Sequence, residues 1–513
     1  MTGNLNIKKW IACYPYVIFF LGAIIVLLQS PLAPFANKLS HSDSNVYIYC
    51  SEQILKGKIM YKELFDHKGP VLYLFNIAGL LIGKGNPTGI WFIEIAMLFI
   101  SLIFIYKSIK LYFNNIIAFI STLSCLLLFL PTLESGNRPE EFAVPFISIS
   151  LYYFLIFLKN YRIKNYQCAI IAFCFSFALL LKPNNIAVWI IGYIFVFVIL
   201  LRKRNLKELF LFLFISVITF LIACLPFAAY FSYTDSWADF KYCIWDFNKS
   251  YSDVSFFALL RRTFKNLWLP PFSFNPIHVF LYIFFITLVI SFKHIMFKKE
   301  VFFIILIIIL SSIFLLSGYH FPHYYLILIP ALAFPYAVVY DFIKKKVTVN
   351  QKLILCFFVL FFTYASINES RNVLFRYNFL SVDGKTGNSI FKKYSEIDTL
   401  ISFIKENSTE TDKISVLGNE CWVYIESGRE SVSKYSYQLP ITSVKFFGQK
   451  IVKEYIEDVK EGNPRIIITG MRSNSLHNNS LKDINEILET KYKRYVYPDL
   501  GCSIWMLKSE SEE

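Results

Sequence analysis

The sequence predicts a polytopic α-helical membrane protein with a C-terminal α/β domain outside the membrane. Of the 513 residues, 56% are hydrophobic, which exceeds the roughly 45–50% of ordinary soluble domains, and the mean hydropathy is +0.50. The net charge of +15 gathers in short Lys and Arg clusters between apolar runs, as the positive-inside rule requires of cytoplasmic loops. Because no nucleic-acid-binding motif accompanies these clusters, we do not expect nucleic acid as a partner.

Eleven apolar runs predict transmembrane helices, each of which needs about 20 residues to cross the hydrocarbon core. The first has no small-residue cleavage site after it, so we expect it to stay as a membrane helix. The predicted spans cover residues 11–30, 89–107, 115–132, 142–158, 166–182, 186–201, 208–230, 276–292, 301–317, 324–341 and 351–367.

A further apolar run over residues 71–82 is interpreted as an interfacial helix. At 1.5 Å per residue its twelve residues reach only about 18 Å, against a hydrocarbon core of about 30 Å. If this run is left out and the N-terminus is inside, every basic cluster between spans falls on the cytoplasmic side. Counting it as a span would place the later clusters outside, against the positive-inside rule.

This topology places the loops 31–88, 133–141, 231–275 and 318–323 outside, together with the tail. We therefore divide the chain into a membrane domain, 1–367, and an extracytoplasmic domain, 368–513, in a bacterial-type plasma membrane. The tail alternates helical patterns with strand-like runs, which predicts a small α/β fold. The helical patterns are 396–407, 449–461 and 481–492, and the strand-like runs are 413–417, 465–469 and 503–507.

The first outer loop contains a candidate general base, Asp43. Val46, Cys50 and Ile54 share one face of a predicted amphipathic helix that suits the membrane surface. Asp43 precedes this helix, where the helix dipole favours an ionised carboxylate. Such a group can accept the proton of an attacking hydroxyl. The alternative is that Asp43 merely caps the helix, and spacing alone does not separate the two interpretations.

Two adjacent acids, Glu140 and Glu141, lie where the chain re-enters the membrane after the second outer loop. Carboxylates at this depth are costly unless they are paired or solvated, so they are candidate catalytic residues. The alternative is that they only decorate the N-terminus of a helix that Pro139 begins.

Other outer-side residues are candidates for binding a phosphate or the substrate. Cations on this side break the positive-inside pattern, and neutralising a lipid phosphate or a departing phosphate would explain them. The alternatives are snorkelling to ordinary headgroups and, for ring side chains, anchoring at the interface. The phosphate candidates are Lys68, Lys182, Arg261, Arg262, His323 and Tyr324, and the candidate substrate contacts are Asp66 and His67.

The order of these motifs resembles the GT-C superfamily of membrane glycosyltransferases, and within it the glycosyltransferase family 39-like group. That group includes the protein O-mannosyltransferases and the lipid A aminoarabinose transferases. The resemblance covers residues 10–340. It rests on Asp43, Lys68-Gly69-Pro70, Glu140-Glu141, Lys182-Pro183 and the segment from His323 to Pro330.

The resemblance implies a GT-C-like fold and inverting transfer of a sugar from a polyprenyl-phosphate donor in cell-envelope glycan biosynthesis. The acceptor would be a lipid, a glycan or a protein. Asp43 would activate the acceptor, Glu140 or Glu141 would support the acceptor or the sugar, and Lys68 and Lys182 would hold the donor phosphate. Because Ser44 follows Asp43, a DxD-type metal site is not evident. No cofactor is assigned, and a divalent metal stays open.

The main alternative is a transporter or flippase of lipid-linked sugars. It predicts polar residues and broken helices near the membrane midplane, whereas the spans are nearly free of charge, with Glu94 as the main exception. The acids gather in outer loops instead, which favours chemistry at the membrane surface. A polysaccharide polymerase also remains an alternative, because such enzymes use arginines in outer loops and Arg261 and Arg262 lie in one.

Overall fold

The computed structural model describes residues 2–34, 43–133, 135–251, 257, 261, 298–315, 321–346, 398–437, 448–469, 482–497 and 502–508. Two predicted spans, 276–292 and 351–367, lie outside the described residues. The predicted domain boundary after residue 367 lies outside them as well.

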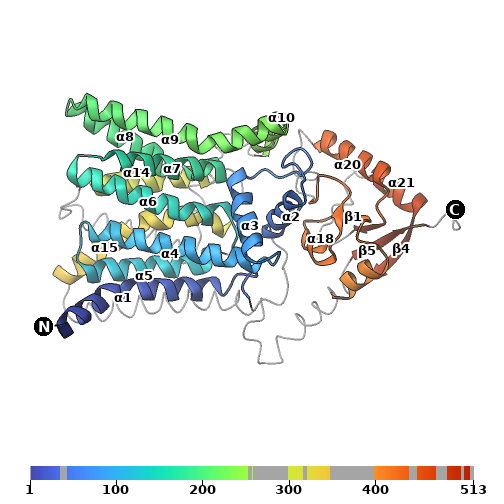
Figure 1. The fold of residues 1–513 in the computed structure, drawn as a ribbon, viewed down its shortest axis with the longest axis horizontal. Coiled ribbons are helices and arrows are strands. Elements are labelled where there is room, and N and C mark those ends of the chain that lie inside the picture. Colours follow the sequence, from blue (N-terminus) through green and yellow to red (C-terminus); the bar gives the residue numbers. More distant parts are fainter. Residues whose placement is uncertain are drawn as a thin grey trace.

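Long helices form a bundle, and the C-terminal domain sits at one end of it (Figure 1). Each predicted span that falls on described residues is helical. Within the described ranges, five helical segments are long and apolar enough to cross a membrane, and shorter apolar helices accompany them. The bundle consists of α1 (Thr2–Leu27), α4 (Thr88–Lys110), α5 (Asn115–Thr132), α6 (Pro139–Asn160), α7 (Asn165–Leu181), α8 (Ala187–Arg202), α9 (Leu206–Tyr233), α14 (Lys298–Leu315) and α15 (Ile329–Lys346).

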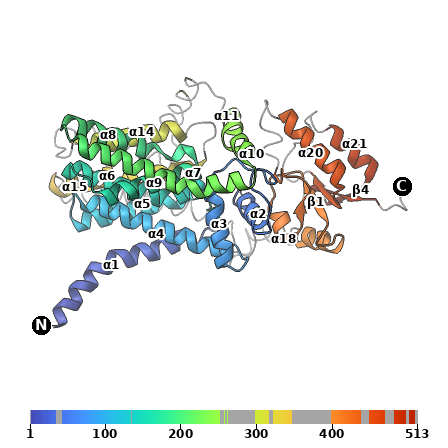
Figure 2. The same ribbon diagram turned by 45° about the horizontal axis from the view of Figure 1, so that its top comes forward.

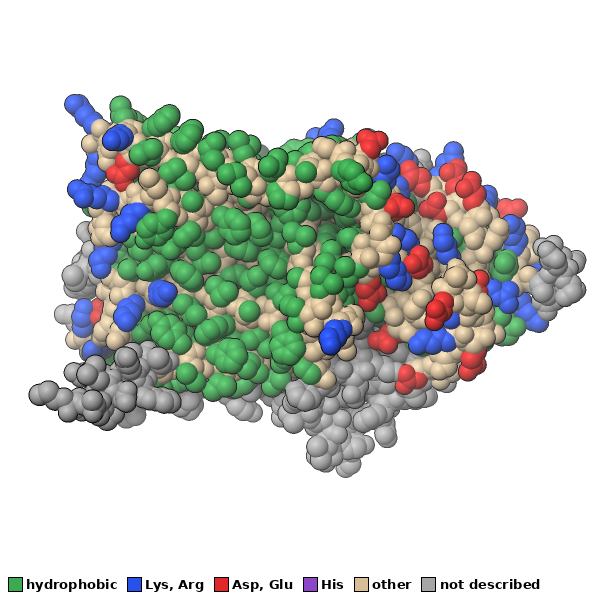
Figure 3. Space-filling view, viewed as in Figure 1, with side chains coloured by type: hydrophobic (Ala, Val, Ile, Leu, Met, Phe, Trp, Pro, Cys, Tyr) green, Lys and Arg blue, Asp and Glu red, His purple; other side chains and the backbone are tan. Residues whose placement is uncertain are grey.

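The outside of the bundle is an apolar band. Hydrophobic side chains cover its flank, whereas Lys and Arg side chains cluster at the end opposite the C-terminal domain (Figure 3). On α9, Phe210 and Leu225 keep 66% and 64% of their surface exposed. Such exposure would be costly in water but is expected of residues that face lipid. The chain is therefore a multi-pass membrane protein.

Two short helices, α2 (Ser44–Leu55) and α3 (Pro70–Ile82), lie across the end of the bundle next to the C-terminal domain (Figures 1 and 2). The thirteen residues of α3 run at a steep angle to the long helices, in keeping with the predicted interfacial helix. Near them lie the short elements η1 (Pro183–Asn185), α10 (Trp237–Lys241), the π-helical turn η2 (Tyr242–Phe247), α11 (Asn248–Tyr251) and η3 (Pro322–Leu328).

The predicted amphipathic helix is present as α2, but protein packs against both of its faces. Polar Ser44, Asn45 and Ser51 are as buried as the apolar face, because α3 packs on one side and α18 (Trp422–Ser427) on the other. The rings of Tyr49 and Tyr424 are 5.0 Å apart across this second contact. An amphipathic pattern predicts burial of the apolar face only. It could not predict that α18 of the C-terminal domain packs on α2 as well.

The C-terminal domain contains a five-stranded mixed sheet of order β2-β1-β3-β5-β4. β1 pairs in parallel with β2 and β3, while β5 runs antiparallel to β3 and β4. The three predicted strands are confirmed as β1 (Lys413–Val416), β3 (Ile466–Thr469) and β5 (Cys502–Leu507). The predicted helices correspond to 398–406, α20 (Gly448–Gly462) and α21 (Lys482–Lys491).

Two strands were not predicted, β2 (Glu430–Ser431) and β4 (Tyr492–Tyr497). β2 is only two residues long, too short to show a period. β4 follows α21 without a break, so no turn residue marked its start.

The C-terminal domain is joined to the first outer loop by direct bonds. The Ser431 backbone N–H donates to the Tyr49 hydroxyl over 2.8 Å, and the Phe65 N–H donates to the Lys434 carbonyl over 3.0 Å. Lys58 Nζ lies 2.9 Å from the Glu430 carboxylate. These contacts place the segment 430–437 against the loop that precedes α3.

Candidate functional site

A cavity of about 580 Å³ lies where the end of the bundle meets the C-terminal domain. The first outer loop, the first turn of α6, the turn after α7, the segment 244–249, η3 and the C-terminal domain all contribute to its wall. Eight of the eleven predicted site residues line it: Asp43, Asp66, His67, Lys68, Glu140, Lys182, His323 and Tyr324.

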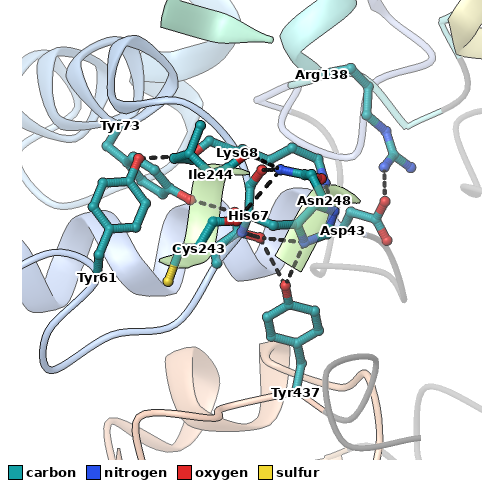
Figure 4. A network of polar contacts seen from close by, with 11 residues as sticks. Asp43, Tyr61, His67, Lys68, Tyr73, Arg138, Cys243, Ile244, Asn248 and Tyr437 are labelled. Carbon is teal, nitrogen blue, oxygen red and sulfur yellow. Dashed lines mark hydrogen bonds and ion pairs between the residues drawn. The ribbon is translucent and has the colours of Figure 1, made fainter. Parts of the chain in front are cut away.

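Asp43 forms an ion pair with Arg138 at one side of this cavity (Figure 4). Its side chain makes no capping hydrogen bond to α2, so the interpretation of Asp43 as a simple cap does not describe its contacts. The Arg138 side chain is only 8% exposed, whereas that of Asp43 is 63% exposed and lines the cavity. Arg138 therefore holds a carboxylate that remains open to a ligand.

The ion pair also keeps Asp43 ionised. Partial burial alone would raise the pKa of Asp43, but the positive charges of Arg138, Lys68 and His323 more than offset it and hold the pKa well below its usual range.

The loop that carries Arg138 is fixed by buried polar contacts. The Asn137 backbone N–H donates to the Glu94 carboxylate, and its side-chain amide donates to Ser44 Oγ over 2.9 Å and exchanges hydrogen bonds with Asn76. A Cβ at Gly136 would lie 2.5 Å from Glu94 Oε1. Glu94, the acidic residue noted within a predicted span, thus fixes the turn that positions Arg138 beside Asp43.

A second ion pair joins Glu140, in the first turn of α6, to Lys182, directly after α7. The Glu140 side chain is 3% exposed, so the pair compensates a carboxylate that would be costly to bury alone. Lys182 Nζ also lies 4.2 Å from the centre of the Tyr324 ring, within the range of a cation–π interaction.

Gly69 allows Lys68 to approach this ion pair. Its N–H donates to the Leu181 carbonyl over 3.1 Å, and a Cβ at this position would lie 1.8 Å from the Leu180 carbonyl oxygen. Only glycine fits that approach. The Lys-Gly-Pro motif therefore brings Lys68 to the helix end that carries Lys182, and both cations line the same cavity.

The segment Asp66-His67-Lys68 is held by side chains from the first outer loop, from α3 and from the C-terminal domain (Figure 4). The hydroxyls of Tyr73 and Tyr437 donate to the Asp66 carboxylate, which is 1% exposed. Tyr61 Oη donates to the Lys68 carbonyl over 2.7 Å.

Within that segment, His67 stands between Tyr437 and Lys68. His67 Nδ1 lies 3.2 Å from Tyr437 Oη, and Nε2 contacts Lys68 Nζ. Burial, then Lys68 and Lys182, lower the pKa of His67 well below its usual range, so its imidazole is neutral. Burial also lowers the pKa of Lys68, assisted by Lys182 and opposed by Asp66 and Asp43.

Three predicted site residues do not line the cavity. Glu141 is buried, and its carboxylate accepts from the Arg138 backbone N–H over 3.5 Å within the first turn of α6. Successive helical residues point about 100° apart, so Glu140 and Glu141 face different surroundings. Arg261 is exposed and away from the cavity, and Arg262 lies outside the described residues.

Other residues of the site were not predicted. Arg138 is an outer-side cation in a loop otherwise rich in acids, so the criterion that selected Lys68 would also have found it. Trp245, Asn248, Asn419 and Tyr437 line the cavity, but no local pattern in the sequence marks them. Among the described residues, no group of three or more His, Cys, Asp or Glu side chains is arranged to hold a metal ion.

Part of the chain is similar to a known protein family. Residues 67–230 match the family model described as dolichyl-phosphate-mannose-protein mannosyltransferase. This segment, about a third of the chain, is similar to that glycosyltransferase family. The match contains Lys68, Glu140 and Lys182, which line the cavity, and Arg138, which pairs with Asp43. No curated protein matches the sequence.

Solved structures share the fold across nearly the whole chain. The crystal structure of ArnT from Cupriavidus metallidurans bound to undecaprenyl phosphate has a TM-score of 0.62 and 13% identity, covering 98% of this chain and 99% of its own. The archaeal oligosaccharyltransferase AglB from Archaeoglobus fulgidus, in complex with an inhibitory peptide and a dolichol-phosphate, has a TM-score of 0.51 and 13% identity. That likeness covers 98% of this chain and 75% of AglB. At these identities the likeness establishes the fold, which is GT-C-like.

Replacing Lys182 with Met should destabilise the protein by leaving Glu140 buried without its cation. Removing one partner of a buried ion pair typically costs about 3–5 kcal/mol. We expect a clearly lower unfolding temperature in detergent for Lys182→Met, with most of the loss recovered in the double variant Lys182→Met/Glu140→Gln. A double variant no more stable than the single one would contradict the pairing.

Proposed function

We propose that the protein transfers a sugar from a polyprenyl-phosphate-linked donor to an acceptor hydroxyl in this cavity, with inversion at the anomeric carbon. One observation carries the proposal: a single cavity at the end of an apolar bundle combines an exposed, ionised carboxylate, Asp43, with the cations Lys68 and Lys182. Inverting transfer from a lipid phosphate requires a base for the acceptor and positive charge for the departing phosphate.

The donor phosphate is assigned to the side of the cavity lined by Lys68, Lys182, His323 and Tyr324. Phosphate leaves as an anion, so cations stabilise the transition state and a general acid is not required. The cavity lies where the apolar band ends, which lets a polyprenyl chain stay in lipid while its phosphate reaches the lysines. The similar folds of ArnT, bound to undecaprenyl phosphate, and AglB, bound to a dolichol-phosphate, support this class of donor.

Asp43 is assigned as the base for the acceptor. The acceptor oxygen attacks the anomeric carbon from the side opposite the phosphate, the bond from that carbon to the phosphate oxygen breaks, and the phosphate departs with the bonding electrons. The hydroxyl proton passes to the Asp43 carboxylate. A carboxylate with a lowered pKa is a weak base, so we place proton transfer late, when the new bond has already made the hydroxyl acidic.

The remaining charged groups have supporting roles. Arg138 would keep the Asp43 carboxylate aimed into the cavity, and Glu140 would orient Lys182 and contact the sugar or the acceptor. We place the cavity on the extracytoplasmic side of a bacterial-type plasma membrane, because the Lys and Arg cluster occupies the opposite end of the bundle.

Replacing Asp43 with Asn should abolish most sugar transfer while the protein still folds. Removing a general base typically costs about 10²- to 10⁴-fold in rate, and Asn keeps the size of the side chain. Transfer of radiolabelled sugar from a polyprenyl-phosphate donor to membrane acceptors measures the effect. Asp235→Asn is the matched control, because Asp235 is exposed outside the cavity. Normal turnover by Asp43→Asn would remove Asp43 from the mechanism.

Replacing Lys68 with Ala should weaken donor binding by about 10- to 100-fold, the usual range for losing a hydrogen bond to a charged group. The apparent KM for the lipid-linked sugar measures it. Lys62→Ala is the control, because Lys62 Nζ lies 3.3 Å from the Thr234 and Asp235 carbonyls and does not line the cavity. An unchanged KM in Lys68→Ala would argue against a phosphate contact.

A further inference from the structure

Tyr437 lines the cavity from the C-terminal domain, yet no step proposed above uses it. Its side chain is buried, at 5% exposure. Its hydroxyl bridges two neighbours in the first outer loop, lying 2.8 Å from Asp66 Oδ1 and 3.2 Å from His67 Nδ1 (Figure 4). A buried hydroxyl that connects two domains beside a candidate phosphate-binding lysine calls for a physical explanation.

The hydrogen-bond directions around Tyr437 form one chain. The Lys68 ammonium can only donate, so His67 Nε2, which contacts it, accepts. A neutral imidazole then carries its hydrogen on Nδ1, and that hydrogen points to Tyr437 Oη. Tyr437 in turn donates its own hydrogen to the Asp66 carboxylate. Each group along the path from Lys68 to Asp66 therefore has a fixed donor or acceptor role.

We propose that Tyr437 is a positioning residue for donor binding, which acts by fixing the orientation of the His67 ring and thereby the ammonium of Lys68. The proposal rests on the assignment of Lys68 to the donor phosphate. Asp66 Oδ1 lies 3.4 Å from His67 Nδ1, slightly farther than the Tyr437 hydroxyl at 3.2 Å. Without the hydroxyl, the imidazole can turn toward the Asp66 carboxylate, which moves Nε2 and with it the Lys68 ammonium.

The position of Tyr437 is set by backbone hydrogen bonds that residues just before it in the chain make to the first outer loop. The hydrogen bonds from Ser431 to Tyr49 and from Phe65 to Lys434 fix how the segment 430–437 lies along the loop. The Phe65 ring also lies 6.5 Å from the Tyr437 ring, centre to centre. The C-terminal domain thus supplies one link of a chain that ends at the lysine, and its docking is coupled to the shape of the donor site.

The full-length protein in detergent provides the test, with undecaprenyl phosphate titrated by calorimetry. Tyr437→Phe should weaken binding by about 3- to 10-fold, the usual effect of one lost hydrogen bond. Tyr435→Phe is the matched control, because the Tyr435 hydroxyl donates to Glu454 over 2.6 Å outside the cavity, and it should bind like the wild type. In a His67→Ala background, Tyr437→Phe should cause no further loss, because the path through the imidazole is already broken.

The outcomes separate this inference from the proposed function. If the wild type does not bind undecaprenyl phosphate, the proposed donor class fails and the inference fails with it. If the wild type binds and Tyr437→Phe binds equally well, only the inference is overturned. Equal losses in Tyr437→Phe and Tyr435→Phe would show a general structural effect. A full additional loss in the His67→Ala background would overturn the route through His67.

Discussion

The site depends on pairing opposite charges at a buried end of the helix bundle. Glu140 and Arg138 have side chains that are 3% and 8% exposed, and an unpaired charge at that depth would cost several kcal/mol. Pairing Glu140 with Lys182 joins the ends of α6 and α7, and pairing Arg138 with Asp43 joins the turn before α6 to the start of α2. The ion pairs therefore assemble the cavity wall as well as charge it.

The same arrangement divides the cavity into two chemical halves. The buried guanidinium of Arg138 pairs with Asp43, so the carboxylate stays ionised while 63% of the Asp43 side chain remains exposed. Lys68 approaches Lys182 only because Gly69 lets the backbone touch the end of α7. Two cations in one place repel each other, and a phosphate between them would relieve that repulsion. The geometry thus favours an anion on the lysine side and a hydroxyl on the Asp43 side.

Sequence patterns predicted features set by local composition. Apolar runs identified the long helices, and three β-rich runs identified strands of the tail. The short length of the 71–82 run, together with the sidedness of the basic clusters, identified α3 as an interfacial helix. Lys68 and Lys182 were selected because they are cations on the predicted outer side, against the positive-inside rule. Features that depend on contacts distant in the chain were missed: the cover of α2 by α18, the separation of Glu141 from Glu140, and Tyr437, which reaches Asp66 across 371 positions. Arg138 was missed although its outer-side charge met the criterion.

A structure of the protein with a polyprenyl-phosphate-linked sugar bound would show whether one cavity holds both the phosphate and the base. We predict that the phosphate contacts Lys68 and Lys182, and that the Asp43 carboxylate faces the anomeric carbon from the side opposite the phosphate oxygen. A phosphate bound away from both lysines, or Asp43 on the same side of the sugar as the phosphate, would contradict it.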